Sequence, residues 1–179
     1  MADTALLVVD MLNTYTHEDA GPLADNVAGI VDPVSRLIGA ARAREDVDLI
    51  YANDNYGDFT AEPRDIVAAA LAGARPELVR PIVPAADSRV LLKVRHSAFY
   101  ATALDYLLTR LEVKRVVLAG QVTEQCILYT ALDAYVRHYS VVVPADAVAH
   151  IEAGLGTAAL AMMERNMGAE ITTAARCLG

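Results

Sequence analysis

The sequence predicts an α/β protein, a three-layer α-β-α sandwich built on a largely parallel, Rossmann-like sheet. Short β-branched segments alternate along the chain with longer segments of helical periodicity, which is typical of βαβ units. The first segment, 5–9 (ALLVV), is apolar throughout, as in a strand covered by helices on both faces. The chain of 179 residues has no repeat or linker and fits one domain, 1–179.

In the first half of the chain, the elements follow from periodicity and turn residues. After the strand at 5–9, apolar side chains recur at spacings of three and four, which predicts one helix over 25–44. Residues 48–52 (DLIYA) are the next strand, and the polar residues 53–63 form a loop. Pro63 opens a short helix over 64–72, because proline suits a first helical turn. Three prolines then predict an irregular connection over 74–88.

The second half continues the same alternation. In chain order, the sequence predicts a strand at 90–94, a helix at 100–111, a strand at 115–119, a helix at 123–137, a strand at 140–143, a helix at 152–166 and a strand at 169–172. Connections between parallel strands are right-handed, so a sheet with helices on both faces is the simplest topology.

Composition excludes several classes of function. The chain has 23 acidic and 15 basic residues, and a net charge of −8 argues against a nucleic-acid or anionic-membrane surface. Two cysteines cannot form a disulfide framework and are typical of a reducing, cytoplasmic environment. The N-terminal apolar segment is too short to span a membrane and lacks the basic start of a signal peptide.

Three reactive side chains follow strands of the predicted sheet. Asp10 ends the first strand, Lys93 lies near the end of the third, and Cys126 comes just after the fourth. Because ligands bind beyond the carboxyl ends of parallel strands, we expect these three side chains at one edge of the sheet. Each also has a plain structural interpretation, as a turn residue, a solvated surface lysine and a small core residue respectively.

Cys126 has the most specific chemistry of the three. If Thr123 caps the following helix, Cys126 lies in its first turn, where free N–H groups and the helix dipole lower the pKa of a thiol. A nearby Lys93 ammonium lowers that pKa further, and Asp10 is placed to exchange a proton with the nucleophile and a leaving group. The N–H groups around Val122 and Cys126 are candidates for stabilising an oxyanion.

Five segments resemble one known family. Residues 120–126 (GQVTEQC) resemble the G-x-x-T-x-x-C signature of the isochorismatase-like cysteine hydrolases. The other four segments match in the family's order, and the resemblance runs from residue 6 to about 172; they are 10–13 (DMLN), 93–99 (KVRHSAF), 129–134 (YTALDA) and 144–147 (PADA).

The resemblance implies a fold and a set of roles. It implies a six-stranded parallel sheet in the order 3-2-1-4-5-6, and a homo-oligomer, either a dimer or a tetramer. It makes Asp10 the base, Lys93 the tuning cation and Cys126 the nucleophile. It also implies a cis peptide bond between Gln121 and Val122, with the N–H groups of Val122 and Cys126 as the donors to an oxyanion.

Two positions depart from the family pattern. The glutamine that follows the catalytic aspartate by two residues is Leu12 here, which removes one polar contact near the base. Nicotinamidase-type members have a D-x-H motif for a metal after the second strand, whereas this chain has Asp54 and then Tyr56. Because zinc and iron favour imidazole or thiolate at such centres, we expect no metal and no other cofactor.

Four further residues are candidates for binding a small-molecule substrate. Asn13 belongs to the segment that resembles the family's first motif, and Asp54 and Tyr56 lie in a loop that can cover the site. Strand alternation places Arg95 on the same face as Lys93, where its guanidinium can meet a carboxylate of the substrate. A merely exposed loop and a solvated arginine are the plain alternatives.

The leading hypothesis is a hydrolase that cleaves the C–N bond of a small amide or carbamoyl compound through a thioester on Cys126. A second hypothesis is an isochorismatase-type vinyl-ether hydrolase, which uses Asp10 and needs no nucleophilic thiol. A third, from a different class, is a non-catalytic ligand-binding or thiol-sensing module. The presence of Cys126 favours amide chemistry over the vinyl-ether reaction.

Overall fold

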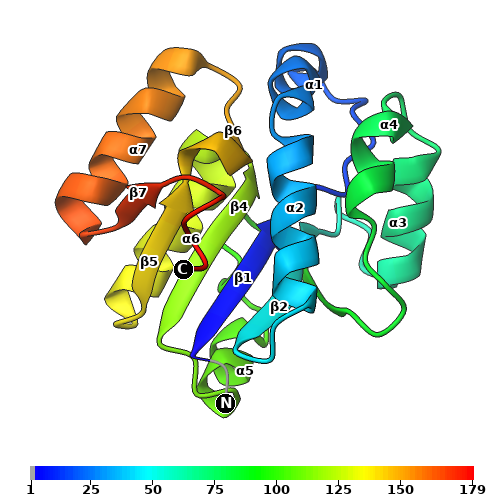
Figure 1. Cartoon of the computed structure of the whole chain (residues 1–179). Coiled ribbons are helices and arrows are strands. Elements are labelled where there is room, and N and C mark those ends of the chain that lie inside the picture. Colours follow the sequence, from blue (N-terminus) through cyan, green and yellow to red (C-terminus); the bar gives the residue numbers. More distant parts are fainter. Residues whose placement is uncertain (1–2) are drawn as a thin grey trace.

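The computed structural model describes residues 3–179, and its centre is a parallel β-sheet (Figure 1). Its strands run in the order β3-β2-β1-β4-β5-β7, and the short β6 pairs with β4. The strands are β1 (Thr4–Val9), β2 (Val47–Asp54), β3 (Arg89–Lys93), β4 (Arg115–Gln121), β5 (Ser140–Pro144), β6 (Val148–Ala149) and β7 (Glu170–Thr172). The predicted order is confirmed, with β7 in the place of the sixth expected strand. The two-residue β6 was not expected.

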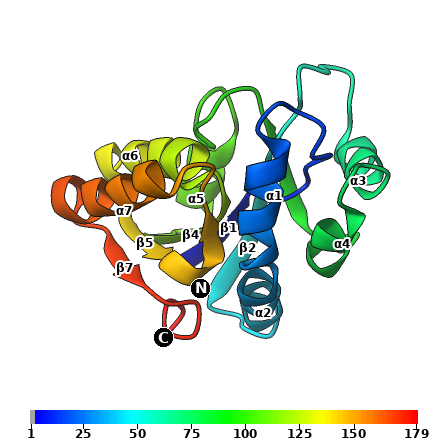
Figure 2. The same cartoon turned by 90° about the horizontal axis from the view of Figure 1, so that it is seen from above.

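Helices cover both faces of this sheet, so the prediction of three layers is confirmed (Figure 2). Side chains of β1 alternate between the two layers: Leu6 and Val8 pack toward α1 to α4, whereas Leu7 and Val9 pack toward α5 to α7. The helices are α1 (Ala20–Ala28), α2 (Val31–Arg42), α3 (Pro63–Leu71), α4 (Pro76–Val79), α5 (Leu104–Arg110), α6 (Leu128–Val136) and α7 (Ala153–Met167).

The predicted helix over 25–44 is wrong in one respect, because the chain forms two helices there. α1 ends at Ala28 and α2 begins at Val31. Pro33 has no N–H to donate to the carbonyl of Gly29 four residues earlier, so a continuous helix cannot keep its hydrogen bonds there. Pro33 instead lies in the first turn of α2, where no such donor is needed.

The segment expected to be irregular also contains short helical structure. Within 74–88 the chain forms α4 and a 3-10 turn over Arg80–Ile82, and Pro76 and Pro81 each lie at a start of a helical segment. Among residues 3–179, no helix is both long enough and apolar enough to cross a lipid bilayer.

The central strands β1 and β4 approach closely at Gly120. Gly120 pairs with Val9 and has a φ of +119°, a conformation that side chains rarely adopt. A Cβ atom at this position would collide with the carbonyl oxygen of Val9. Glycine is therefore needed here for β1 and β4 to reach the edge of the sheet in register.

Candidate active site

Strand register brings the predicted site residues to one edge of the sheet. Val9 pairs with Ala52 on one side and with Gly120 on the other, so the next residues of all three strands lie in one row. That row contains Asp10, and β3 adds Lys93, which pairs with Asp54. Cys126 reaches the same edge from the turn that follows β4.

Lys93 is the centre of this cluster. Its side chain has no exposed surface, and its Nζ lies 2.8 Å from Asp10 Oδ2 and 3.6 Å from Asp54 Oδ2. The same ammonium donates to the carbonyl of Arg95 at 3.0 Å and contacts Cys126 Sγ at 3.6 Å. Burial alone lowers the pKa of Lys93, but the nearby negative groups, Asp10 first, outweigh burial and raise it. Lys93 is therefore a buried, charged ammonium.

Asp10 is held tightly at the end of β1. It has a φ of 52°, unusual for a residue with a side chain, and its carbonyl accepts a hydrogen bond from Gln121 Nε2 at 2.5 Å. Its Oδ1 accepts the N–H of Asp54 at 2.8 Å, while its Oδ2 faces Lys93. Burial raises the pKa of this carboxyl, and the Lys93 charge opposes that effect. Asp10 thus binds a proton more readily than an exposed aspartate.

A π-helical turn over Thr123–Ile127 presents Cys126. The Val122 carbonyl accepts the N–H groups of Gln125 at 3.0 Å and Ile127 at 3.1 Å, and not that of Cys126. The expectation that Thr123 caps this helix is wrong. Val122 occupies the capping position, and the buried Thr123 hydroxyl has no hydrogen-bond partner among the described residues. Widened turns of this kind often occur at functional sites.

The expected low pKa of the Cys126 thiol is also wrong for this resting structure. Burial raises the pKa of Cys126 to about 12, and the Asp10 carboxylate raises it further than Lys93 lowers it. Cys126 as a residue is only 7% exposed, so the favourable effect of a helix start does not decide the ionisation of its thiol. At neutral pH the Cys126 thiol is therefore protonated.

The backbone next to the thiol has the conformation that the resemblance implies. The peptide bond between Gln121 and Val122 is cis. The side chain of Gln121 is fully buried and joins this peptide to Asp10, as its Nε2 donates to the Asp10 carbonyl. The nearby backbone N–H of Val122 lowers the pKa of Cys126.

The expected substrate-binding residues are placed around the cluster with different neighbours. Asn13 Oδ1 accepts the N–H of Tyr15 at 2.7 Å, and the Tyr56 hydroxyl donates to the Leu12 carbonyl at 2.7 Å. Asn13 and Tyr56 both line a cavity of about 410 Å³ beside the loop that follows β1. Asp54 faces Lys93 instead of this cavity.

The alternation of side chains along a strand does not extend to Arg95. β3 ends at Lys93, and residues 94–97 form a bend, so strand geometry does not set the direction of the Arg95 side chain. The side chain is exposed, and its backbone carbonyl accepts the Lys93 ammonium. The bend instead brings the neighbouring His96 to the sulfur, with Nδ1 3.6 Å from Cys126 Sγ.

Three residues near the site were not found from the sequence. His96 contacts the thiol, Gln121 holds Asp10, and Asn53 binds both the N–H and the carbonyl of Leu12 at 2.9 and 3.2 Å. Asn53 and Gln121 directly follow the paired residues Ala52 and Gly120, so their position at the strand ends was an available signal. For His96, the only signal in the sequence was its position three residues after Lys93.

At the position where nicotinamidase-type proteins bind a metal, the side chains of this chain bind other groups of the protein. Asp54 Oδ1 accepts the N–H of Tyr56 at 2.7 Å, and its Oδ2 faces the Lys93 ammonium. The Tyr56 hydroxyl donates its hydrogen bond to the carbonyl of Leu12. Within residues 3–179 there is no group of three or more His, Cys, Asp or Glu side chains arranged to hold a metal ion. The donor set therefore does not fit such a metal.

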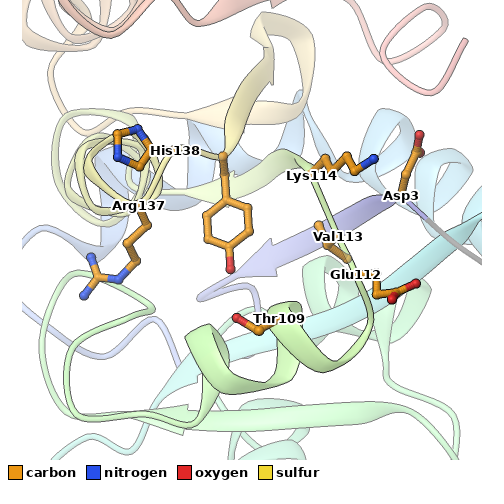
Figure 3. Close-up of a pocket in the computed structure, with 8 residues that line it drawn as sticks. Asp3, Thr109, Glu112, Val113, Lys114, Arg137 and His138 are labelled. Carbon is orange, nitrogen blue, oxygen red and sulfur yellow. The ribbon is translucent and has the colours of Figure 1, made fainter.

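A cavity of about 620 Å³ lies at the opposite edge of the sheet, where β1, β4 and β5 begin (Figure 3). Arg137 in this cavity is already paired with Asp133 at 2.7 Å and Asp105 at 3.7 Å. The cavity is separate from the thiol cluster, and its lining contains no cysteine; it consists of Asp3, Thr109, Glu112, Val113, Lys114, Arg137, His138 and Tyr139.

Comparisons with known proteins agree with this arrangement. A family profile described as the isochorismatase domain matches residues 4–176. The chain is 38% identical over 172 residues to YaaI of Bacillus subtilis, an uncharacterized isochorismatase family protein, and the match covers 96% of this chain and 94% of that protein. A probable inactive nicotinamidase of Arabidopsis thaliana is 32% identical over 188 residues, with coverage of 96% and 92%.

The fold is shared with solved structures. The crystal structure of N-carbamoylsarcosine amidase from Thermoplasma acidophilum superposes with a TM-score of 0.77 at 28% sequence identity. The superposition covers 100% of both chains.

Proposed function

Since the chain belongs to the isochorismatase-like hydrolase family, we propose that it hydrolyses the C–N bond of a small amide or carbamoyl compound through a thioester on Cys126. The observation that carries this proposal is the cluster at the sheet edge, where Cys126 Sγ, the Lys93 ammonium and the Asp10 carboxylate meet and are largely shielded from solvent. A nucleophile, a proton acceptor and a fixed positive charge are the groups that acyl transfer requires.

In the first half of the proposed reaction, Asp10 accepts the thiol proton as Cys126 Sγ attacks the carbonyl carbon of the substrate. The raised pKa values of both groups suit this step, because the thiol keeps its proton until attack and the carboxyl can hold it afterwards. Asp10 then delivers the proton to the departing amine, and the thioester remains on Cys126.

The backbone of the π-helical turn supplies the proposed oxyanion donors. The nearby Val122 N–H lowers the pKa of the thiol, and the Cys126 N–H is not bound to the Val122 carbonyl. Two such donors stabilise the negative oxygen of a tetrahedral intermediate. Lys93 keeps Asp10 in position and offsets the charge that builds up near the sulfur.

Substrate binding is proposed at the mouth of the same site. Asn13 and Tyr56 line the adjoining cavity, and Asp54 and the exposed Arg95 flank Lys93. An Arg95 guanidinium in solvent can bind a carboxylate on the substrate. The name of the Thermoplasma acidophilum relative, an amidase of an N-carbamoyl amino acid, supports a substrate that combines a carbamoyl group with a carboxylate.

The test is a panel of small amides and carbamates, with isochorismate included, assayed with wild type, Cys126→Ala and Asp10→Asn. We expect turnover of a C–N substrate that both substitutions abolish, while Cys177→Ala, a matched change at the other buried cysteine, leaves it intact. Turnover of isochorismate that survives Cys126→Ala would establish the vinyl-ether reaction instead. Binding without turnover by wild type would favour a non-catalytic module.

We also propose that the chain forms a homo-oligomer. α6 and α7 pack side by side (Figure 2). Together they expose several large apolar side chains to solvent. A second copy of the chain would cover this surface, which consists of Tyr129, Leu132, Tyr135, Val136, Leu155 and Met162. Light scattering should give the mass of a dimer or tetramer, and Leu132→Glu should shift it to that of a monomer; a wild-type monomer contradicts this proposal.

A further inference from the structure

We propose that His96 is the base that activates water in the second half of the reaction, when the thioester on Cys126 is hydrolysed. This inference rests on the proposed function, because it requires an acyl group on Cys126. It assigns a catalytic role to a residue outside the Asp10, Lys93 and Cys126 cluster.

His96 and Lys93 contact the Cys126 sulfur from different sides. Cys126 Sγ has Lys93 Nζ at 3.6 Å on its buried side and His96 Nδ1 at 3.6 Å on its solvent side. Lys93 is fully buried and Asp10 is 8% exposed, whereas His96 is exposed. Water that enters after the amine has left therefore arrives on the side of the imidazole.

The two carboxylate oxygens of Asp10 already accept hydrogen bonds. Oδ1 accepts the N–H of Asp54 and Oδ2 accepts the Lys93 ammonium, each at 2.8 Å. These bonds hold Asp10 beside the thiol for the first proton transfer, but they direct the carboxylate inward. His96 Nδ1 has the sulfur as its only hydrogen-bond neighbour among the described residues, and in the tautomer that carries its proton on Nε2 the lone pair of Nδ1 can accept a proton from water once the thiol is acylated.

The imidazole of His96 is held in place by a neighbouring aromatic ring. The His96 ring stacks on Tyr129, with centroids 5.4 Å apart and planes at 25°. Tyr129 lies three residues after Cys126, in the first turn of α6, so the helix that continues from the π-helical turn supports the ring that faces the sulfur. A base of fixed orientation beside the reacting sulfur meets the geometric requirement for general-base catalysis.

Hydrolysis of the thioester consumes one water molecule and regenerates the Cys126 thiol. A water molecule gives one proton to His96 Nδ1 while its oxygen forms a bond to the acyl carbon. The C–S bond then breaks, Cys126 leaves as the thiolate, and the imidazolium returns the proton to the sulfur. The products are the free carboxylic acid and the protonated thiol, and no other reactant is needed.

The experiment uses p-nitrophenyl acetate, whose good leaving group makes acylation independent of a proton donor. Stopped-flow absorbance follows acylation as an initial burst and hydrolysis of the acetyl-thioester as the linear phase. For His96→Gln we expect an unchanged burst rate, a linear phase roughly 100-fold slower and acetyl-Cys126 accumulating in the mass spectrum. In His96→Ala, added imidazole should restore part of the linear phase, because the site is open to solvent there.

His138→Asn is the matched control, since His138 is an exposed histidine at the opposite edge of the sheet. It should leave both phases unchanged. A linear phase that His96→Gln does not slow, or a slowed burst without accumulation of acetyl-Cys126, overturns the role of His96. If Cys126→Ala keeps full turnover of the amide substrate, the proposed function itself fails, and the two failures are thereby distinguished.

Discussion

At the scale of single residues, the charge of one buried lysine organises the site. Lys93 Nζ is within 3.6 Å of two carboxylates and a sulfur, and its side chain has no exposed surface. Removing a charge from such a cluster leaves the opposite charge buried without a partner, which is much more costly than loss of a surface pair.

We therefore expect Lys93→Met to lower the free energy of unfolding by about 3–5 kcal/mol at pH 7, measured by urea denaturation. The deficit should shrink in Asp10→Asn/Lys93→Met, because that variant no longer buries the Asp10 charge alone. Lys114→Met, at an exposed lysine before β4, is the control and should change stability little. Equal losses at the two lysines would contradict the buried ion pair.

In the free protein, the charge of Asp10 should disfavour ionisation of the Cys126 thiol. Burial and the Asp10 charge together raise the pKa of Cys126 to about 12. In a Cys177→Ala background, we expect Asp10→Asn to lower that pKa and to speed alkylation by iodoacetamide at pH 8 by about tenfold, corresponding to one pKa unit. The same substitution should abolish turnover.

Asp19→Asn, at an exposed aspartate before α1, serves as the control and should leave the alkylation rate unchanged. Slower alkylation in Asp10→Asn than in wild type would show that Asp10 promotes ionisation of the free thiol, against the electrostatics of this structure.

At the scale of elements, the pattern of apolar residues predicted most strands and helices. It did not predict local features of the backbone, such as breaks and bends. Alternating strand and helix segments, with polar residues at strand ends, were enough to expect Asp10, Lys93 and Cys126 at one edge. The break between α1 and α2 depends on hydrogen bonds that Pro33 cannot make, and the apolar periodicity of the segment continues through it. The bend after Lys93, which turns His96 toward the sulfur, has no periodic signal at all.

The pairing of β1 with β4 supports a prediction at this scale. Gly120→Ala places a Cβ against the Val9 carbonyl at a φ of +119°, so both strands must shift. We expect a loss of about 3 kcal/mol in the free energy of unfolding, from backbone strain and overpacking combined. Thermal and urea denaturation would measure it.

Gly39→Ala provides the matched control, because Gly39 is exposed in α2 and a Cβ there has no neighbour within 4 Å. That variant should gain up to about 1 kcal/mol from helix propensity. If Gly120→Ala were as stable as wild type, the close approach of β1 and β4 would not be needed for the fold.

At the scale of the whole molecule, the two buried thiols link folding to alkaline pH. Burial raises the pKa of Cys126 to about 12 and that of Cys177 to about 11, from an ordinary value near 9. The unfolded chain therefore loses these protons first as the pH rises, and the stability that the thiols contribute below pH 9 is lost between pH 9 and the folded values.

We expect the stability difference, wild type minus Cys126→Ala/Cys177→Ala, to fall as the pH is raised from 8 to 11. Comparing the two proteins by urea denaturation at each pH removes the contribution of the tyrosines, which both share. A difference that stays constant over this range would mean that the thiols ionise equally in the folded and unfolded chains.

The burial of both cysteines also makes the chain a reporter of its own unfolding. Cys126 lies on one side of the sheet and Cys177 in the core on the other, with exposures of 7% and 0%. A thiol reagent at mildly alkaline pH will modify unfolded chains at both positions, whereas native chains react slowly at Cys126 and remain protected at Cys177. The fraction of chains labelled at Cys177 in a mass spectrum then reports opening of the core on its side of the sheet.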